Sequence, residues 1–464
     1  MIPVFTRVFA PEQYGISNEM YAYSSLLLVL LTYGMETTFF RFSETEPDRN
    51  KVYSTSLISL LVTTALFIIA AVAASTPIAR VIRYPDHVEY IIWFVLIVSL
   101  DALTAIPFAK LRAANKAKRF AAIKLINIFF YVLLILFFLL LCPYMMKHGI
   151  LCGIIRYVYN EKIGVGYIFI SNLLASILTV VLLLPEYIKI KYRFDFALWK
   201  RMMPYALPLL VVGFAGIINE TMDRVFLKFL LPADKSMYQL GIYGACYKIS
   251  IIMTIFIQAF RFAAEPFFFA QAAEADAKKI YADVMKYFII ICSLIFLLVM
   301  MYMDVVKYFV GSDYYSGLGV VPILLLANMF LGIYFNLSIW YKLTGRTSYG
   351  AYISVGGAVV TIVLNVLWIP VIGYMGSAWA TFICYFLMMF VSYFIGQKHY
   401  HVSYSLKECL GYLLLAVVLY FLSVWLCPEA KNLRLLLNTG LLFIYIFIIS
   451  YFERAALRRL LKRS

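Results

Sequence analysis

Seven side chains that can bind a ligand or carry charge recur along the segment 240–268, whose other residues are mostly apolar. At about 100° of rotation per residue in a helix, all seven fall within about 80° of one another. The guanidinium of Arg261 can hold a diphosphate through two parallel hydrogen bonds. The hydroxyl and amide groups suit sugar hydroxyls, and the carboxylate can titrate. The seven residues are Tyr243, Tyr247, Ser250, Thr254, Gln258, Arg261 and Glu265.

A second polar face of this kind follows the segment 16–40. Because lipid penalises such a face, we expect both segments to turn it toward a shared central cavity. The alternative is that these groups form hydrogen bonds between packed helices. Full charges at one end of both faces favour the cavity, since charges inside a membrane usually mark transport pathways. The members of this second face are Asn18, Tyr21, Ser25, Thr32 and Glu36.

Charged residues also interrupt the apolar segments 203–231 and 89–109. Glu220 and Arg224 are four residues apart and can pair along one helix, as can Arg261 and Glu265. Such pairs either hold helices together or leave the arginines to bind an anionic head group while the acids titrate. Asp101 either carries a proton or makes a hydrogen bond between helices. The candidate titratable residues are Glu36, Asp101, Glu220, Asp223 and Glu265.

The composition requires a membrane protein around these residues. The 464 residues are 64% hydrophobic and 14% charged, whereas soluble domains have about 45–50% apolar and about 25% charged residues. Apolar runs of about 20 residues recur along the chain, which is the length that spans a bilayer as a helix. The net charge of +16 does not indicate nucleic acid, because the basic residues lie mostly in short loops between these runs.

The apolar runs predict thirteen complete transmembrane helices in an all-α fold. Short loops join them, so no soluble domain is inserted. The opening residues Met1–Phe9 read as the end of a further helix, and we expect fourteen helices in the intact protein. The predicted spans are 16–40, 55–79, 89–109, 122–142, 166–185, 203–231, 240–268, 285–310, 320–341, 351–370, 376–396, 408–427 and 433–453.

The basic residues predict the orientation. One set of alternate loops, with the C-terminal tail, holds 26 of the 40 lysines and arginines, and the other set holds 11. The loop from Lys110 to Lys124 alone has six and no acid. Basic loops stay on the cytoplasmic side, so the C-terminus is expected in the cytoplasm.

Short repeated motifs divide the chain into two halves. Residues 6–9, Thr-Arg-Val-Phe, match residues 223–226, Asp-Arg-Val-Phe. The end of segment 16–40 at Glu36 matches the end of segment 240–268 at Glu265, and the loop 112–116 matches the loop 342–346. The predicted organisation is a six-helix lobe at 1–201, a second at 202–400, and two extra helices with a basic tail at 401–464. An even number of helices per unit makes the repeats parallel, and transporters of this kind bind substrate between halves that rock.

This ensemble resembles the bacterial oligosaccharide flippases of the multidrug/oligosaccharidyl-lipid/polysaccharide exporter superfamily. The resemblance is carried by TRVFAPEQYG at residues 6–15, Asp223-Arg224, AEPFFF at residues 264–269 and the arrangement of six, six and two helices. It implies an inner-membrane transporter that moves undecaprenyl-diphosphate-linked sugar units to the periplasmic leaflet for lipopolysaccharide, capsule or exopolysaccharide. It implies a cationic central cavity and coupling to a proton or sodium ion. Expected partners are the lipid-linked oligosaccharide, membrane lipids and other polysaccharide-assembly membrane proteins.

Other functions fit the residues less well. A cation-coupled multidrug exporter of the same superfamily is the alternative, but its cationic drugs need an acidic cavity and Arg261 opposes them. A membrane polymerase or ligase needs a large catalytic outer loop, which the sequence lacks, so we expect no enzyme activity, cofactor or catalytic metal. The phosphate-binding pattern G-x-x-x-x-G-K-[ST] does not occur, which argues against transport driven by ATP.

Overall fold

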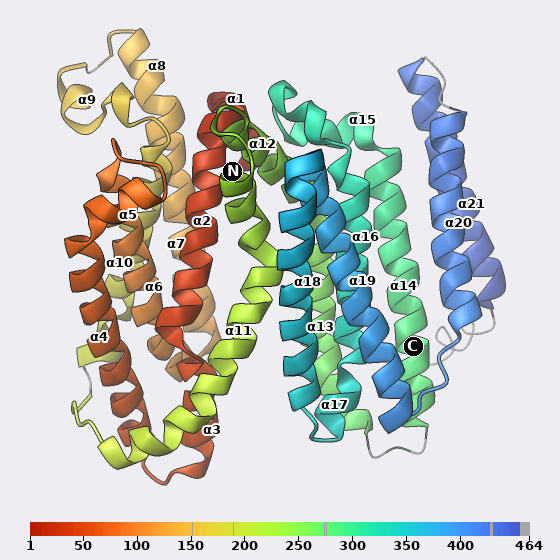
Figure 1. Ribbon diagram of the computed structural model, residues 1–464, viewed down its shortest axis with the longest axis horizontal. Coiled ribbons are helices and arrows are strands. Elements are labelled where there is room, and N and C mark those ends of the chain that lie inside the picture. Colours follow the sequence, from red (N-terminus) through yellow and green to blue (C-terminus); the bar gives the residue numbers. More distant parts are fainter. Residues whose placement is uncertain (151, 189, 273, 275, 427–429, 455–464) are drawn as a thin grey trace. The chain divides into compact units, whose positions relative to one another are not determined.

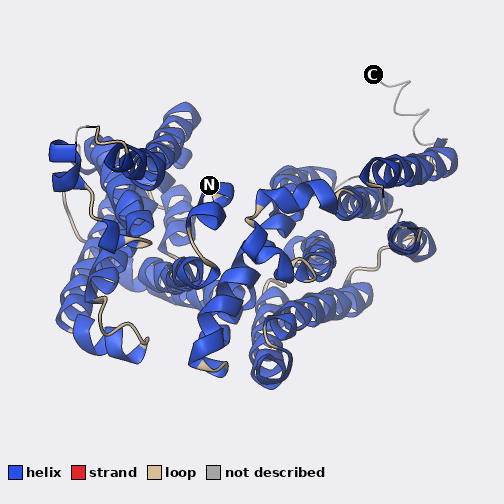
Figure 2. Ribbon diagram, turned by 90° about the horizontal axis from the view of Figure 1, so that it is seen from above, coloured by secondary structure: helices blue, strands red, loops and turns tan. Residues whose placement is uncertain are grey.

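The computed structural model describes residues 1–150, 152–188, 190–272, 274, 276–426 and 430–454. Within these ranges the chain forms helices joined by short turns, and no strand occurs (Figures 1 and 2). Twelve helices there are long and apolar enough to cross a membrane. The chain is therefore a multi-pass membrane protein, and the expected all-α fold is confirmed. A bilayer requires this architecture, because helices satisfy their backbone groups internally.

The helices form two compact units, the first covering residues 12–225 and the second covering residues 2–11 and 226–464. The first contains α2 (Pro11–Thr32), α3 (Met35–Thr45), α4 (Arg49–Ala73), α5 (Ser75–Val81), α6 (Val88–Ala113), α7 (Ala117–Leu136), α8 (Cys142–Lys147), α9 (Cys152–Val158), α10 (Gly166–Ile188) and most of α11 (Phe196–Leu230). The second contains α1 (Ile2–Val8), α12 (Ala233–Tyr247), α13 (Ile251–Gln271), α14 (Ala277–Met301), α15 (Met303–Val306), α16 (Val320–Leu337), α17 (Ile339–Leu343), α18 (Ser348–Ile372), α19 (Tyr374–His399), α20 (Leu406–Trp425) and α21 (Lys431–Phe452).

The repeat predicted from the sequence reappears as a repeated packing order. In the first unit α6 packs against α4 and α10, and α10 packs against α7. In the second unit α16 packs against α14 and α19, and α19 packs against α18. These are the same pairs under the expected correspondence of the two halves. The two units therefore repeat one packing order, and the helices α20 and α21 follow the second repeat.

The first predicted span, 16–40, is broken in the structure. The backbone at Tyr33 and Gly34 takes φ values of 33° and 71°, which ends α2 and starts α3. A Cβ atom at Gly34 would lie 2.8 Å from the main-chain oxygen of Ala206, so glycine allows the close approach of α11. The other twelve spans correspond to the twelve apolar helices, although the span predicted as 285–310 already ends at Met301.

The ends of the first unit also differ from the predicted lobe 1–201. Helix α11 runs unbroken through that boundary, and its Leu198 and Met202 pack in a core cluster with Met35 and Tyr53 of the first unit. The N-terminal residues instead pack on the second unit. The backbone N–H of Gly311 donates to Thr6 Oγ1 at 2.9 Å, and the hydroxyl of Tyr314 donates to the carbonyl of Phe9 at 2.8 Å.

Helices α20 and α21 are bonded to α14 of the second unit at the end that the sequence predicts to lie in the cytoplasm. Lys286 Nζ on α14 and the Tyr412 hydroxyl on α20 donate to the Glu453 carboxylate at 2.9 and 2.8 Å. Burial raises the pKa of the Glu453 carboxyl, but the hydrogen bonds and the lysine charge lower it by more, so its pKa lies below the ordinary value. The carboxylate is therefore charged at neutral pH and joins three helices.

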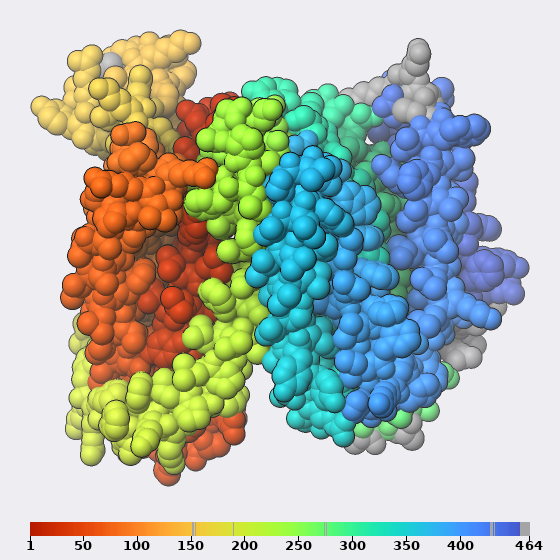
Figure 3. Space-filling view, in the orientation of Figure 1, coloured from red at the N-terminus to blue at the C-terminus, as the bar shows by residue number. Residues whose placement is uncertain are grey.

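The outward surface of the helices suits lipid. Helix α18, at the front of Figure 3, exposes Leu367 and Val371. On α4 the side chains of Leu66 and Ile69 are likewise exposed. Large apolar side chains at such positions are what contact with acyl chains requires. The polar residues considered next are therefore exceptions on these helices.

Candidate functional site

A polar cavity of about 530 Å³ lies inside the first unit. It contains three residues predicted from the sequence, Thr32, Glu36 and Asp101, so the structure brings two of the candidate acids to one place. The volume is within the range of about 300–1,000 Å³ found for small-ligand sites. Its other polar lining residues are Thr104, Arg112, Lys124, Asn127, Asn172, Ser176 and Thr179.

Each acid of this first-unit cavity has a polar partner. Glu36 pairs with Arg112 at the end of α6. Asp101 accepts a hydrogen bond of 2.8 Å from the hydroxyl of Ser176 on α10. A hydrogen bond between helices was one of the two roles that the sequence left open for Asp101. Lys124 Nζ lies 4.2 Å from the ring centroid of Phe108. Two carboxylates and two cations thus balance one another, and the amides and hydroxyls supply neutral hydrogen-bonding groups.

Sequence reasoning missed the contributions of α7 and α10 to the first-unit cavity. Asn172, Ser176 and Thr179 are spaced by four and three residues and so share one face of α10, which the same wheel argument could have found. Asn127 on α7 donates to the carbonyl of Ala175 and to the hydroxyl of Thr179, at 2.9 and 2.8 Å. These polar residues are isolated within strongly apolar helices, so the composition of those segments gave little indication of a polar site.

The remaining polar residues of α2 are used largely within their own helix. Asn18 donates to the carbonyl of Tyr14 at 3.0 Å and Ser25 to that of Tyr21 at 2.9 Å. The Tyr21 hydroxyl accepts 3.1 Å from Asn172, which connects α2 to α10. Asn18 and Ser25 are therefore paired with the backbone of α2 itself, and Tyr21 borders the α10 face that lines the cavity.

Glu19 is a buried acid that the sequence analysis did not select. Its side chain is fully buried and accepts hydrogen bonds from the hydroxyls of Tyr23 and Tyr84, at 2.8 and 2.6 Å. Tyr84 belongs to the turn between α5 and α6, so the carboxylate joins that turn to α2. An acid within the predicted span 16–40 was the available signal.

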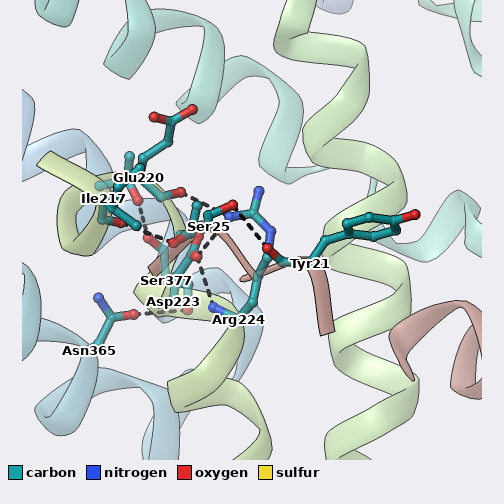
Figure 4. Close-up of polar contacts among 10 residues, drawn as sticks. Tyr21, Ser25, Ile217, Glu220, Asp223, Arg224, Asn365 and Ser377 are labelled. Atoms are coloured by element: carbon teal, nitrogen blue, oxygen red, sulfur yellow. Dashed lines mark hydrogen bonds and ion pairs between the residues drawn. The ribbon is translucent and has the colours of Figure 1, made fainter. Parts of the chain in front are cut away.

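The charged residues of α11 pair differently from the prediction (Figure 4). Arg224 Nη1 lies 3.2 Å from Asp223 Oδ1 and donates to the main-chain carbonyl of Glu220 at 2.9 Å. The carboxylate that pairs with Arg224 is thus that of Asp223, while the Glu220 side chain is exposed. Arg224 and Asp223 are both buried, so this pair is desolvated.

The predicted face on 240–268 is not one continuous stripe. A 3₁₀ turn at Lys248–Ser250 separates α12 from α13. Because that turn rotates about 120° per residue, it shifts the face by roughly 60° relative to a continuous α-helix. Tyr243, Tyr247 and Ser250 are buried in the second unit, whereas Gln258 and Arg261 are exposed. Thr254 lies between the two sets and is partly buried.

Arg261 and Glu265 lie together in a small pocket of the second unit, but they do not form the predicted pair. Glu265 Oε1 lies 2.8 Å from Lys342 Nζ on α17. The Arg261 guanidinium instead lies over the Phe335 ring, 4.5 Å from its centroid. Lys342 can reach Glu265 because α17 directly follows α16, and both of these helices pack against α13. Among the described lining residues, two cations face one carboxylate, so the pocket carries net positive charge.

The two ion pairs correspond under the internal repeat. Glu36 matches Glu265, and the loop that starts at Arg112 matches the loop that starts at Lys342. Glu36–Arg112 is formed within the first unit and Glu265–Lys342 within the second. Each half therefore contains one of the two repeat-related ion pairs.

Comparison with known structures agrees with the fold. The lipid II flippase MurJ in an inward closed conformation matches with a TM-score of 0.68 at 16% identity, over 96% of this chain and 94% of that chain. An inward-facing multidrug resistance MATE family transporter of the MOP superfamily matches with a TM-score of 0.68 at 13% identity, over 85% and 92%. At these identities the likeness establishes the fold.

Sequence comparison supplies the family. No well-characterised protein sequence matches the chain. The profile of a family described as "Polysaccharide biosynthesis protein" matches residues 1–272, which is more than half of the chain. The fold is the one seen in the flippase and the transporter structures above, as the resemblance in the sequence predicted. The chain therefore belongs to the polysaccharide biosynthesis protein family, with the fold seen in the MurJ and MATE structures.

Proposed function

We propose that the protein flips undecaprenyl-diphosphate-linked oligosaccharide units from the cytoplasmic to the periplasmic leaflet, for lipopolysaccharide, capsule or exopolysaccharide synthesis. The observation that carries this proposal is the pocket in which Arg261 and Lys342 outnumber the single carboxylate of Glu265. A diphosphate that crosses hydrocarbon needs fixed cations, because an isolated buried anion is costly. Arginine suits this task, since it stays charged and can bind phosphate through two hydrogen bonds.

The first-unit cavity has a complementary part in this proposal. Its amides, hydroxyls and balanced charges match the hydroxyl groups of a glycan better than a second anion. The two lobes would then rock to expose the substrate first to one side of the membrane and then to the other. Of the predicted sugar-binding residues, Thr32 lines this cavity, Tyr21 contacts its wall, and Gln258 is exposed on α13.

A cation-coupled multidrug exporter is the second candidate. Its support is the likeness to MATE transporters and the presence of Glu36, Asp101 and two phenylalanines in the first-unit cavity. A cationic drug would need a carboxylate without a positive partner. Glu36 is paired with Arg112, and Lys124 shares the cavity with Asp101, which favours the lipid-linked oligosaccharide.

Transport by purified protein distinguishes the two candidates. Proteoliposomes would contain a fluorescent polyprenyl-diphosphate-linked oligosaccharide, and an impermeant glycosidase would report how much glycan reaches the outside. We expect the protein to raise that fraction above the level of empty liposomes, and to leave the distribution of a cationic dye unchanged. Saturable movement of the dye without movement of the glycan would contradict the flippase proposal.

The same vesicles test energy coupling to a proton or sodium ion. The candidate coupling acids are Glu36, Asp101, Glu220, Asp223 and Glu265. Flipping against a concentration difference is expected only with an ion gradient or membrane potential. Equal accumulation without either would contradict active transport and leave passive flipping.

We further propose that the protein lies in the cytoplasmic membrane with its C-terminus in the cytoplasm. The uneven distribution of basic residues between alternate loops supports this orientation. A reporter fused after Ser464 that is active only in the cytoplasm is expected to be active. Activity of a periplasm-specific reporter at the same position would reverse the orientation.

A further inference from the structure

Asn336 on α16 is a buried amide without a hydrogen-bond partner among the described residues. Its side chain is 2% exposed, and in the part of the chain that the structure describes neither Nδ2 nor Oδ1 is bonded. It lines the pocket that also holds Arg261, Glu265 and Lys342. An unsatisfied buried amide costs folding free energy. Its retention beside two cations therefore calls for an explanation in terms of a ligand.

Two other buried asparagine side chains of the second unit have partners for both amide atoms. Asn365 donates to the carbonyl of Thr361 at 2.7 Å and accepts from Ser377 at 3.0 Å, a bond also drawn in Figure 4. Asn438 donates to the carbonyl of Met301 and accepts from Ser423, at 2.5 and 2.6 Å. Gln397 Oε1 is a further buried amide atom of this unit without a partner among the described residues, but its Nε2 donates to the carbonyl of Val402 at 2.8 Å. Asn336 differs in that both of its amide atoms lack a partner there.

The pocket is nearly closed in this conformation. Its free volume is about 20 Å³, which is room for one water molecule. The Glu265–Lys342 ion pair forms part of the wall, and its side chains are 40% and 23% exposed. Partly exposed ion pairs contribute little free energy. Lys342 can therefore leave Glu265 when an anion enters, which widens the pocket and adds a second cation to Arg261.

The two unbonded atoms of Asn336, a donor and an acceptor, require a ligand with more than anionic oxygens. A diphosphate at neutral pH offers acceptors only, so it satisfies Nδ2 but leaves Oδ1 unbonded. A sugar attached to the diphosphate adds hydroxyl or amide donors next to the phosphate. We propose that Asn336 binds the junction between the diphosphate and the first sugar, with Nδ2 donating to a phosphate oxygen and Oδ1 accepting from the sugar. This inference rests on the proposed function, and it makes Asn336 the residue that distinguishes the loaded lipid carrier from the empty one.

Such a site favours the ligand that carries the sugar, because only that ligand gives Oδ1 a hydrogen-bond partner. We therefore expect the protein to bind a polyprenyl-diphosphate hexose about tenfold more tightly than the same polyprenyl diphosphate without sugar. Because of this preference, the empty carrier left after polymer assembly does not compete strongly with the substrate.

The test compares binding of these two lipids by the full-length protein in nanodiscs. The variant Asn336→Leu is expected to keep or raise the melting temperature, because it removes two unsatisfied polar atoms. Its affinity should fall about tenfold for the empty carrier, which loses the bond from Nδ2, and about 100-fold for the polyprenyl-diphosphate hexose, which loses both bonds, so the preference should disappear. Asn336→Asp keeps an acceptor but adds negative charge, so it should weaken binding of both lipids.

The matched control is Asn438→Leu, which removes a buried amide that does have partners. It should lower the melting temperature and leave the preference for the hexose lipid intact. Wild-type affinities in Asn336→Leu would mean that the amide holds only a water molecule, and would overturn the inference. Arg261→Ala separates the two proposals. If Asn336→Leu and Arg261→Ala both bind the two lipids normally, the diphosphate site of the proposed function also fails. If only Arg261→Ala weakens binding of both lipids, the role of Asn336 fails but the diphosphate site remains supported.

Discussion

Replacing Arg261 by alanine is expected to abolish polysaccharide at the cell surface while the protein level in the membrane stays normal. The guanidinium is exposed and rests on the Phe335 ring, and the Glu265 carboxylate keeps its partner Lys342 in the variant. No buried charge is left unpaired, so folding should be little affected. Loss of charge-assisted hydrogen bonds to a diphosphate costs about 3 kcal/mol, or roughly 100-fold in transport. Surface polymer and membrane protein level are measured side by side.

Two further variants make the Arg261 result interpretable. Arg261→Lys should restore transport only in part, because an ammonium keeps the charge but not the two parallel hydrogen bonds. Arg454→Ala is the matched control, since Arg454 also lies over an aromatic ring, 4.9 Å from the centroid of Tyr451, at the end of α21. It should leave transport unchanged. Recovery of transport in Arg261→Ala combined with Glu265→Ala would refute direct contact with substrate and point to charge balance within the protein.

The largest effect on stability is expected from Gly241→Ala. A Cβ atom at this position of α12 would lie 1.8 Å from the main-chain oxygen of Pro11 and 2.6 Å from its carbonyl carbon. Both are backbone atoms, so relief requires the segment after α1 to leave the second unit. Overpacking of this severity destabilises by about 3 kcal/mol or more. The melting temperature of the purified protein, and its abundance in the membrane, should both fall.

Gly356→Ala is the control for that experiment. Gly356 lies within α18, and an added Cβ meets nothing within 4 Å among the described residues. Alanine favours helix by about 0.5–1 kcal/mol over glycine, so this variant should match or exceed the wild-type melting temperature. Equal melting temperatures for Gly241→Ala and the wild type would show that residues 2–11 do not pack on the second unit as described.

The transmembrane helices could be predicted because they depend on local apolar content. The runs that predicted spans such as 89–109 and 351–370 correspond to α6 and α18 within a few residues. The internal repeat was also readable, since it preserves short motifs. The break at Gly34 was not, because it depends on the approach of α11, which is distant in the sequence.

Side-chain pairing was harder to predict than the helices. A spacing of four residues predicted Arg261–Glu265, but Lys342 competes for the carboxylate from another helix. The turn at 248–250 divides a face that a uniform helical wheel had joined. Asn336 escaped notice altogether, because one asparagine in an apolar helix carries no periodic signal. Spacing along the chain ranks partners within one helix, whereas the site is built between helices.

The duplicated ion pairs have a consequence for how the protein arose. A bond present in both halves, Glu36–Arg112 and Glu265–Lys342, is most simply inherited from one ancestral half that was later duplicated. The residue four positions before the glutamate is Arg261 in the second half and Thr32 in the first half, so the guanidinium is present in one half only. A lipid with a sugar at one end and a long chain at the other has no twofold symmetry. Binding it requires the descendants of the ancestral half to diverge at the residues that touch it, while the residues that hold each half together remain alike.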